Sequence, residues 1–478
     1  MDIVAFALTV AAAAEHLTVF WHAPVQGGVL AGVSSETVGF LLPLAARDDV
    51  TLVHVDGFSP TSTFVAGLPR LHQQALRTQP RFRLDDVAKT LAIERRRCIH
   101  VIGWDPGYYR AKLKLVRRVG AVALPTASAV AQLRRCAVAG RVMFETDTLP
   151  PHWLDSIREL DEVWVPSRFM QDIVARALGA EAQRCDAGAE ECAASATATA
   201  TATTRVHIPI KVLHEPLDTR DWFGAPHPGR EAARERLLPA GCPHDAIVFL
   251  SVFKWERRKS GRALIAAFDA EFGNARDARS ACLVLRTKLP EGTTLAALRA
   301  VAEDGAAAAA PRPYIATVPQ LAGLDYALLF AAANVFVLPS HGEGWGRTLV
   351  EGMAMGLPVI GTNWGGATEF LNASNSLLLP VSSLELAAEG VRRGGGGPAA
   401  DVDDVFSAAS VGKWAAIEPD ALRAVLRRAF EMTPAERKAL GRAARASAIQ
   451  FDQRVVGGQL HGLLRSAAHP LRRGETEQ

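Results

Sequence analysis

Short apolar runs with strand-like composition alternate with amphipathic stretches through most of the chain. In the first half, the strand-like runs are 17–21, 50–55, 99–102, 142–144 and 162–165, and helical patterns cover 151–160 and 169–178. After a run at 206–213, the alternation restarts with 247–252, 282–285, 335–338 and 358–360. A repeated strand-then-helix order is typical of parallel sheets with crossover helices. We therefore predict an α/β fold.

One segment breaks the alternation, between residues 181 and 204. It contains an Ala-Thr repeat and has no apolar periodicity, so we expect a low-complexity insertion that cannot bury enough surface to order itself. A chain of 478 residues also exceeds one ordinary hydrophobic core. We predict a first domain at 1–215 that contains the insertion, a second domain at 216–445, and a helical segment with a tail at 446–478.

Composition and charge narrow the class of protein. Hydrophobic residues make up 49% of the chain and charged residues 22%, which is the balance of a globular enzyme. The net charge of +3 does not favour nucleic acid, whose binding proteins concentrate basic residues on one face. No segment has about 18 uninterrupted apolar residues, so we expect no transmembrane helix. Peripheral contact with a membrane remains open.

The cysteines and the N-terminus bear on the cellular compartment. The six cysteines are scattered and form no C-x-x-C pair, so we expect reduced thiols and no structural zinc site. Residues 1–14 are apolar apart from Asp2 and Thr9, but they lack the positively charged start of a signal peptide. We expect a cytoplasmic protein, with the secretory pathway as the alternative.

The most informative segment runs from Pro339 to Val359, with the sequence PSHGEGWGRTLVEGMAMGLPV. A strand leads into a glycine-rich turn, and a helix is expected to start near Arg347 or Thr348. The N–H groups and the dipole at a helix start favour a phosphate group. Two carboxylates, Glu343 in the turn and Glu351 in the helix, lie beside that position and are separated by seven residues.

In this context, the sequence resembles the retaining glycosyltransferases of family 4, the glycosyl transferases group 1. The resemblance implies that Glu343 contacts the donor sugar and Glu351 the ribose of its nucleotide. It implies the GT-B fold, in which two Rossmann-like domains face each other across a cleft. The N-terminal domain would bind the acceptor and the C-terminal domain the nucleotide sugar, with the last helix returning to the N-terminal domain. The remaining donor-binding residues that it implies in this turn are Gly344, Trp345, Gly346, Arg347 and Thr348.

A second match follows the predicted strand 247–252. The family usually has Gly-Arg, four residues and Lys-Gly, with both cations on the diphosphate; Lys254 and Lys259 occupy these two positions. We predict that both neutralise the charge that develops on the leaving diphosphate. The chain departs from the pattern by having Lys254 for arginine and Ser260 for glycine, and lysine lacks the planar bidentate contact of arginine. We interpret the neighbouring Arg257 and Arg258 as solvated surface residues.

Further candidate loops follow other predicted strands. Gly365 and Gly366 resemble the glycine pair beside the donor sugar in this family, and Glu369 follows them. Gly27 and Gly28 resemble its N-terminal loop near the diphosphate or the acceptor, although a plain turn explains them equally well.

The sequence Glu145-Thr146-Asp147, followed by Val-Trp-Val-Pro-Ser, resembles a subgroup of the family. At the carboxyl end of a parallel strand, Glu145 and Asp147 would accept a hydrogen bond from the attacking hydroxyl or the sugar. Alternatively, Asp147 forms an Asx turn or caps the helix at Pro151.

The implied reaction is metal-independent transfer of a hexose-type sugar from a UDP- or GDP-sugar to a hydroxyl of a glycan, lipid or small-molecule acceptor. No cofactor is implied, because the nucleotide sugar is a substrate. Asp401-Val402-Asp403 spells a metal-binding D-x-D motif, but we interpret it as solvated acid in a polar loop. The alternatives are an inverting transferase, a GT-B phosphorylase or sugar-nucleotide epimerase, and a catalytically silent binding or scaffold protein. Base recognition is expected near 317–321.

Overall fold

The protein forms two compact units, each built on a parallel sheet. The first comprises Met1–Met143, Pro151–Pro216 and Gln453–Gln478, and the second Phe144–Pro150 and Leu217–Asp452. The domain boundary predicted at 215/216 thus falls beside the division at Pro216, but the structure groups Phe144–Pro150 with the second unit. The computed structural model describes residues 17–22, 31–54, 97–103, 136–179, 182–185, 207–224, 226–274, 276–301, 312–319, 321, 324–387 and 411–467.

The described part of the first unit contains a seven-stranded sheet with the order β2-β1-β3-β4-β5-β7-β6, and all of its strand pairs are parallel. Most of the buried side chains in its strands are apolar, because a parallel sheet is covered on both faces, although Thr18, His22 and His100 are buried as well. The strands are β1 (Leu17–His22), β2 (Val50–His54), β3 (Arg97–Ile102), β4 (Ala137–Arg141), β5 (Glu162–Val165), β6 (Ala182–Arg184) and β7 (Ile208–Val212).

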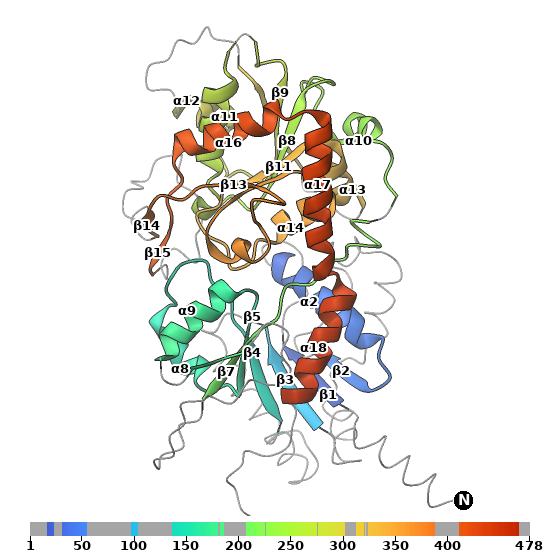
Figure 1. Cartoon of the computed structure of the whole chain (residues 1–478), viewed down its shortest axis with the longest axis vertical. Coiled ribbons are helices and arrows are strands. Elements are labelled where there is room, and N and C mark those ends of the chain that lie inside the picture. The colour runs from blue at the N-terminus through green and yellow to red at the C-terminus, as the bar shows by residue number, and fades with distance from the viewer. Residues whose placement is uncertain are drawn as a thin grey trace, which may run out of the picture. The chain divides into compact units, whose positions relative to one another are not determined.

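The helices of this unit are α2 (Ala31–Ala45), α8 (Pro151–Ile157), α9 (Arg168–Leu178) and α18 (Gln453–Ala467). Helix α18, from the end of the described chain, packs against α2, from its beginning (Figure 1). Helix α2 is also tied to the sheet by a buried ion pair, in which Arg141 Nη2 lies 2.5 Å from Glu36 Oε1. The same guanidinium donates to the carbonyl oxygen of Leu213, so its burial is compensated by hydrogen bonds.

The second unit contains a six-stranded parallel sheet with the order β10-β9-β8-β11-β12-β13. Counted from β8, this is the order 3-2-1-4-5-6 of a Rossmann fold, and its strand order reverses between β8 and β11. The strands are β8 (Ile247–Val252), β9 (Ala281–Arg286), β10 (Tyr314–Val318), β11 (Val335–Leu338), β12 (Val359–Thr362) and β13 (Leu377–Leu379). A separate antiparallel pair is formed by β14 (Leu384–Leu386) and β15 (Lys413–Ala415).

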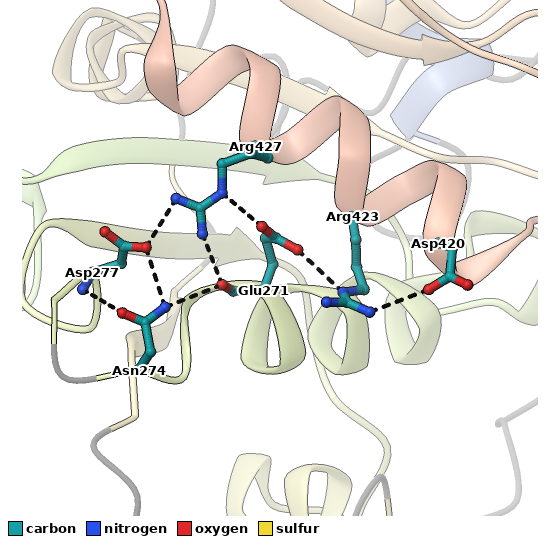
Figure 2. Close-up of polar contacts among 6 residues, drawn as sticks. All are labelled: Glu271, Asn274, Asp277, Asp420, Arg423 and Arg427. Carbon is teal, nitrogen blue, oxygen red and sulfur yellow. Dashed lines mark hydrogen bonds and ion pairs between the residues drawn. The ribbon is translucent and has the colours of Figure 1, made fainter.

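A polar network holds α16 (Pro419–Glu431) of this unit against α11 (Gly261–Phe272) (Figure 2). Glu271 accepts hydrogen bonds from Arg423 at 3.1 Å and from Arg427 at 2.6 Å, and Arg427 also donates to Asp277 at 2.9 Å. The Arg427 guanidinium lies over the ring of Phe272.

The described helices of the second unit are α10 (Arg230–Leu237), α11 (Gly261–Phe272), α12 (Leu295–Val301), α13 (Leu324–Ala332), α14 (Arg347–Ala354), α16 (Pro419–Glu431) and α17 (Pro434–Ala448), with 3₁₀ turns at Arg257–Lys259, Gly365–Glu369 and Ile449–Phe451.

The predicted class of two Rossmann-like α/β domains is confirmed, and the differences are local. The strand predicted at 142–144 is wrong, because β4 ends at Arg141 and is formed by the weakly strand-favouring residues Ala137–Arg141. The predicted insertion at 181–204 begins as an edge strand, since β6 (Ala182–Arg184) pairs with β7. Most of the insertion, the glycine pair 27–28, the N-terminal 14 residues and the D-x-D motif at 401–403 lie outside the described residues.

The expectation of reduced cysteines is wrong. Cys98 is bonded to Cys136 and Cys242 to Cys282, and Cys185 is also disulfide-bonded. Scattered cysteines revealed nothing of this pairing, because it depends on which segments the fold brings together. Structural disulfides persist in oxidising compartments, so they weigh against the reducing compartment inferred from the sequence. Within the described ranges, no helix is long and apolar enough to cross a membrane.

Breaking one disulfide tests this correction. The Cys242–Cys282 bond closes a segment with a sequence separation of 40, so Cys242→Ser should lower the free energy of unfolding by about 2–4 kcal/mol. The measurement is denaturant unfolding under non-reducing conditions, with the unaltered protein in dithiothreitol for comparison. Equal stability of variant and unaltered protein, together with free Cys242 and Cys282 thiols in alkylation and mass spectrometry, would contradict the pairing.

Candidate functional site

The predicted donor residues gather at one edge of the sheet in the second unit. Residues 254–260 follow the carboxyl end of β8, and residues 340–346 follow the carboxyl end of β11. These two strands are hydrogen-bonded neighbours at the point where the strand order reverses. Ligands of open α/β sheets bind at this kind of position.

Glu343 is the centre of this edge. Its side chain is 9% exposed, and Oε1 accepts hydrogen bonds from Lys259 Nζ at 2.5 Å and Ser340 Oγ at 2.6 Å. Oε2 accepts from Arg258 Nη1 at 3.0 Å, and the same nitrogen donates to the carbonyl oxygen of Gly342 at 2.8 Å. Both carboxylate oxygens are therefore held by donors on the loop after β8 and on the Glu343 loop itself.

The charge of Glu343 follows from these contacts. Burial alone raises the pKa of a carboxyl group, but the cations of Lys259 and Arg258 and the hydroxyl of Ser340 lower the pKa of Glu343 to about 2. The carboxylate is thus ionised at neutral pH and accepts hydrogen bonds without donating any.

Arg258 corrects the sequence interpretation, which left it on the solvated surface. Its side chain is 16% exposed, and it pairs with Glu343, with Glu256 at 3.3 Å and with Glu145 at 3.5 Å. Burial lowers the pKa of this guanidinium, but the three carboxylates raise it above its ordinary value. Arg258 therefore joins three segments of the second unit.

Arg257 is not a freely solvated residue either. Its guanidinium lies over the ring of Trp414 and donates to the carbonyl oxygen of Ala387 at 3.0 Å. Lys254, predicted to pair with the diphosphate, is 45% exposed and forms an ion pair with Glu256 at 2.8 Å. The structure therefore brings Lys259 onto Glu343 and gives Lys254 a different carboxylate.

The two predicted acids of the segment Phe144–Pro150, Glu145 and Asp147, make different contacts. Glu145 contacts Arg258, and burial raises the pKa of Glu145 above its ordinary value despite that cation. The carboxylate of Asp147 accepts from the backbone N–H of Lys413 at 2.7 Å and from the hydroxyl of Thr148 at 3.1 Å. Asp147 thus anchors this segment to β15, a contact that neither the predicted ligand role nor the alternative of an Asx turn or a helix cap included.

The backbone conformation of Ser260 accounts for the glycine that the family pattern has at this position. Ser260 joins the 3₁₀ turn to α11 with φ 55° and ψ 33°, in the left-handed region that side chains disfavour. Its hydroxyl oxygen is buried and has no hydrogen-bond partner among the described residues. Ser260 therefore adopts a backbone conformation that glycine would adopt without strain.

Glu351 lies on the buried face of α14. Its Oε2 accepts from the Tyr326 hydroxyl at 2.6 Å, and Arg347 Nε lies 3.3 Å from Oε1. Burial raises the pKa of Glu351, and Arg347 and Tyr326 oppose that rise in part. Tyr326, on α13, was not identified from the sequence, which carries no local signal of this contact.

The glycines of the donor loops allow two backbone segments to pack together. The N–H of Gly366 donates to the carbonyl oxygen of Glu343 at 2.6 Å, and a Cβ at Gly366 would lie 1.9 Å from the carbonyl oxygen of Gly344. Gly346 has φ 106° and directly precedes α14. These positions admit no side chain without displacement of the backbone.

Trp345 was predicted to bind the donor, but its indole is a core side chain. It is 1% exposed and packs edge-to-face against Phe370 and Phe451. Any contact of Trp345 with a ligand would therefore come from its backbone.

Comparison with known proteins agrees with this geometry. The sequence profile described as glycosyl transferases group 1 matches residues 244–393, which cover the sheet edge with Glu343 and Glu351. Residues 244–393 are thus similar to the group 1 glycosyltransferases.

Curated relatives match a part of the chain. A D-inositol 3-phosphate glycosyltransferase of Streptomyces scabiei is 32% identical over 145 residues, which cover 30% of this chain and 31% of the relative. The putative teichuronic acid biosynthesis glycosyltransferase TuaC of Bacillus subtilis is 37% identical over 76 residues, covering 16% and 19% of the two chains. The matches thus span a third or less of the length of these relatives.

Solved structures show that the fold likeness extends beyond the group 1 segment. HepE of Anabaena, in complex with UDP and glucose, matches with a TM-score of 0.54 at 16% identity and covers 93% of this chain and 98% of its own. Sucrose-phosphate synthase of Thermosynechococcus elongatus matches with a TM-score of 0.52 at 16% identity, covering 94% and 98%. The chain therefore has the GT-B fold that the sequence resemblance implied.

Replacing Ser260 tests the strain at the end of the 3₁₀ turn. Ser260→Gly should raise the free energy of unfolding by about 1 kcal/mol, because glycine adopts the left-handed region without a steric penalty. Ser260→Ala is the control, since it removes the hydroxyl and keeps the strained Cβ. If denaturant unfolding found the glycine variant no more stable than the alanine variant, the strain would be disproved.

The pH dependence of stability tests the state of Glu343. Its pKa is lowered from 4.5 to about 2 on folding, so its contribution is present above pH 4.5 and is lost as the pH falls through 2. Between pH 5 and pH 2 the unaltered protein should lose about 3 kcal/mol more stability than Glu343→Gln. Parallel losses of unfolding free energy in the two proteins would show that Glu343 is not held ionised.

Proposed function

We propose that the protein is a retaining glycosyltransferase that moves a hexose-type sugar from a nucleotide diphosphate sugar to an acceptor hydroxyl. The observation that carries this proposal is the buried Glu343 carboxylate, which is paired with Lys259 and Arg258. It lies where the strand order of the sheet reverses, between β8 and β11. The solved complexes of HepE with UDP and with UDP-glucose support a nucleotide sugar as the donor. We assign the donor as a UDP- or GDP-sugar.

The residues divide the binding of the donor between them. Ionised Glu343 accepts hydrogen bonds from the sugar hydroxyls, and Glu351 accepts them from the ribose. Lys259, Lys254 and the backbone N–H groups of 344–348 neutralise the diphosphate, aided by the dipole of α14. Because these cations stabilise the leaving group, the proposed transfer needs no metal ion. The backbone of Gly365 and Gly366 shapes the wall beside the sugar, since it packs against the Glu343 loop.

The chemical step proceeds on one face of the sugar. The acceptor oxygen bonds to the anomeric carbon on the side from which the diphosphate leaves, so the configuration is retained. The bond between the anomeric carbon and the phosphate oxygen breaks, and its electron pair stays on the diphosphate. The phosphate oxygen released from the anomeric carbon takes the proton of the acceptor hydroxyl. We assign the contact with the acceptor to Glu145, because Arg258 connects Glu145 with Glu343. We assign the loop with Gly27 and Gly28 to binding of the acceptor or the diphosphate.

A thermal-shift panel tests donor binding and selects the base. UDP, GDP, ADP and their common sugars are compared without metal and then with magnesium, because a ligand of the folded state raises the melting temperature. One base should give a clear shift that does not depend on magnesium and is lost in Glu351→Ala. The absence of a shift with every nucleotide would contradict the proposal.

Product analysis tests the transferase assignment. With the sugar nucleotide selected by the panel, release of the nucleoside diphosphate should fall roughly 10²–10³-fold in Lys259→Ala at saturating donor, because Lys259 faces charge that grows in the transition state. Lys438→Ala, an exposed lysine on α17, is the control and should keep full turnover. Unchanged turnover in Lys259→Ala would refute its role, and an inverted anomer in the NMR spectrum of the product would refute retention. Nucleotide binding without any transfer would identify a silent binding protein.

A further inference from the structure

Two neighbouring, partly exposed polar side chains at the carboxyl end of β9 each have one buried polar atom without a hydrogen-bond partner. Within the described parts of the chain, neither Arg286 Nε nor Thr287 Oγ1 finds a partner. In the sheet, Arg286 lies between Val252 of β8 and Val318 of β10. It therefore stands at the same carboxyl edge as the loop after β8.

Arg286 is connected with Glu351 through one aromatic ring. Its guanidinium lies over the ring of Tyr326, 5.4 Å from the centroid, and the Tyr326 hydroxyl donates to Glu351 at 2.6 Å. Arg347 approaches the other oxygen of Glu351 at 3.3 Å. The four side chains form a continuous group in which two guanidinium cations face a single carboxylate.

Such a group is incomplete by itself. A buried polar atom without a partner loses its hydrogen bonds to water and gains none in return, so each such atom in a folded protein requires an explanation. Two adjacent ones at the ligand edge of a Rossmann sheet indicate that a bound molecule supplies the missing partners. That molecule must offer acceptor oxygens or nitrogens, because a guanidinium nitrogen only donates and a hydroxyl donates as well as accepts.

We propose that Arg286 and Thr287 bind the nucleoside part of the donor, through acceptor atoms of the base or the ribose. This inference rests on the proposed function, which places the ribose on Glu351. The nucleoside is favoured over the diphosphate because Tyr326 joins Arg286 to Glu351, whereas the diphosphate has its own cations in Lys254 and Lys259. The two residues thus help to determine which nucleotide the enzyme accepts.

Two variants test the inference, Thr287→Val and Arg286→Gln. The valine matches the shape of threonine without its hydroxyl, so the nucleotide-free protein should keep or raise its melting temperature, because no hydrogen bond is lost. The dissociation constant for the nucleoside diphosphate should rise roughly three- to tenfold in Thr287→Val and roughly 10–100-fold in Arg286→Gln. The probe is whichever of UDP, GDP and ADP shifts the unaltered protein most, with its monophosphate in parallel.

The matched control is Arg423→Gln, which removes one cation from the same unit in the network with Glu271 and Asp420 (Figure 2). It should bind the nucleotide like the unaltered protein. Equal losses of affinity for the monophosphate and the diphosphate in the two test variants support contact with the nucleoside.

Three outcomes would overturn the inference. If the unaltered protein binds nucleotide and both variants bind equally well, Arg286 and Thr287 take no part, although the proposed function stands. A loss confined to the diphosphate would exclude contact with the nucleoside. If no nucleotide binds the unaltered protein, the proposed function fails, and this inference fails with it.

Discussion

The buried carboxylate of Glu343 determines the arrangement of the sheet edge around it. An ionised group in this position requires cations and hydrogen-bond donors nearby, and Lys259, Arg258 and Ser340 supply them at 2.5–3.0 Å. Arg258 in turn draws in Glu256 and Glu145. The outcome is a compact group with equal numbers of cations and anions: Lys254, Arg258 and Lys259 against Glu145, Glu256 and Glu343.

This balance has a consequence for the binding of a nucleotide sugar. A diphosphate adds negative charge to a group that is already neutral, so it must take cations from carboxylates. Lys259 is bonded to Glu343 in the structure, and its transfer to the diphosphate would leave the Glu343 oxygen available for sugar hydroxyls. Donor binding and the preparation of Glu343 for the sugar would then be one event, in which the α14 dipole and the backbone of the glycine loops assist.

The sequence predicted the residues whose roles depend on a local motif. The roles of Glu343, Glu351 and Lys259 were predicted from the resemblance to the family 4 glycosyltransferases, whose motifs lie in short stretches of sequence. Arg258 was missed, since only the distant Glu145 and Glu343 distinguish it from the neighbouring Arg257. Trp345 was predicted to contact the ligand because of its position in the motif, but its side chain packs against other aromatic residues of the core. The disulfides depend on which segments become neighbours in the fold, which cysteine spacing does not reveal.

A crystal structure with the nucleoside diphosphate and the intact sugar nucleotide would test the central claim most directly, namely that the donor binds around Glu343 at the β8 and β11 edge. We predict that the diphosphate lies on Lys259 and the backbone of 344–348, that the Lys259 ammonium leaves Glu343, and that the sugar hydroxyls donate to the freed carboxylate. A nucleotide bound at another edge of the sheet, with the Lys259–Glu343 pair intact, would contradict the account.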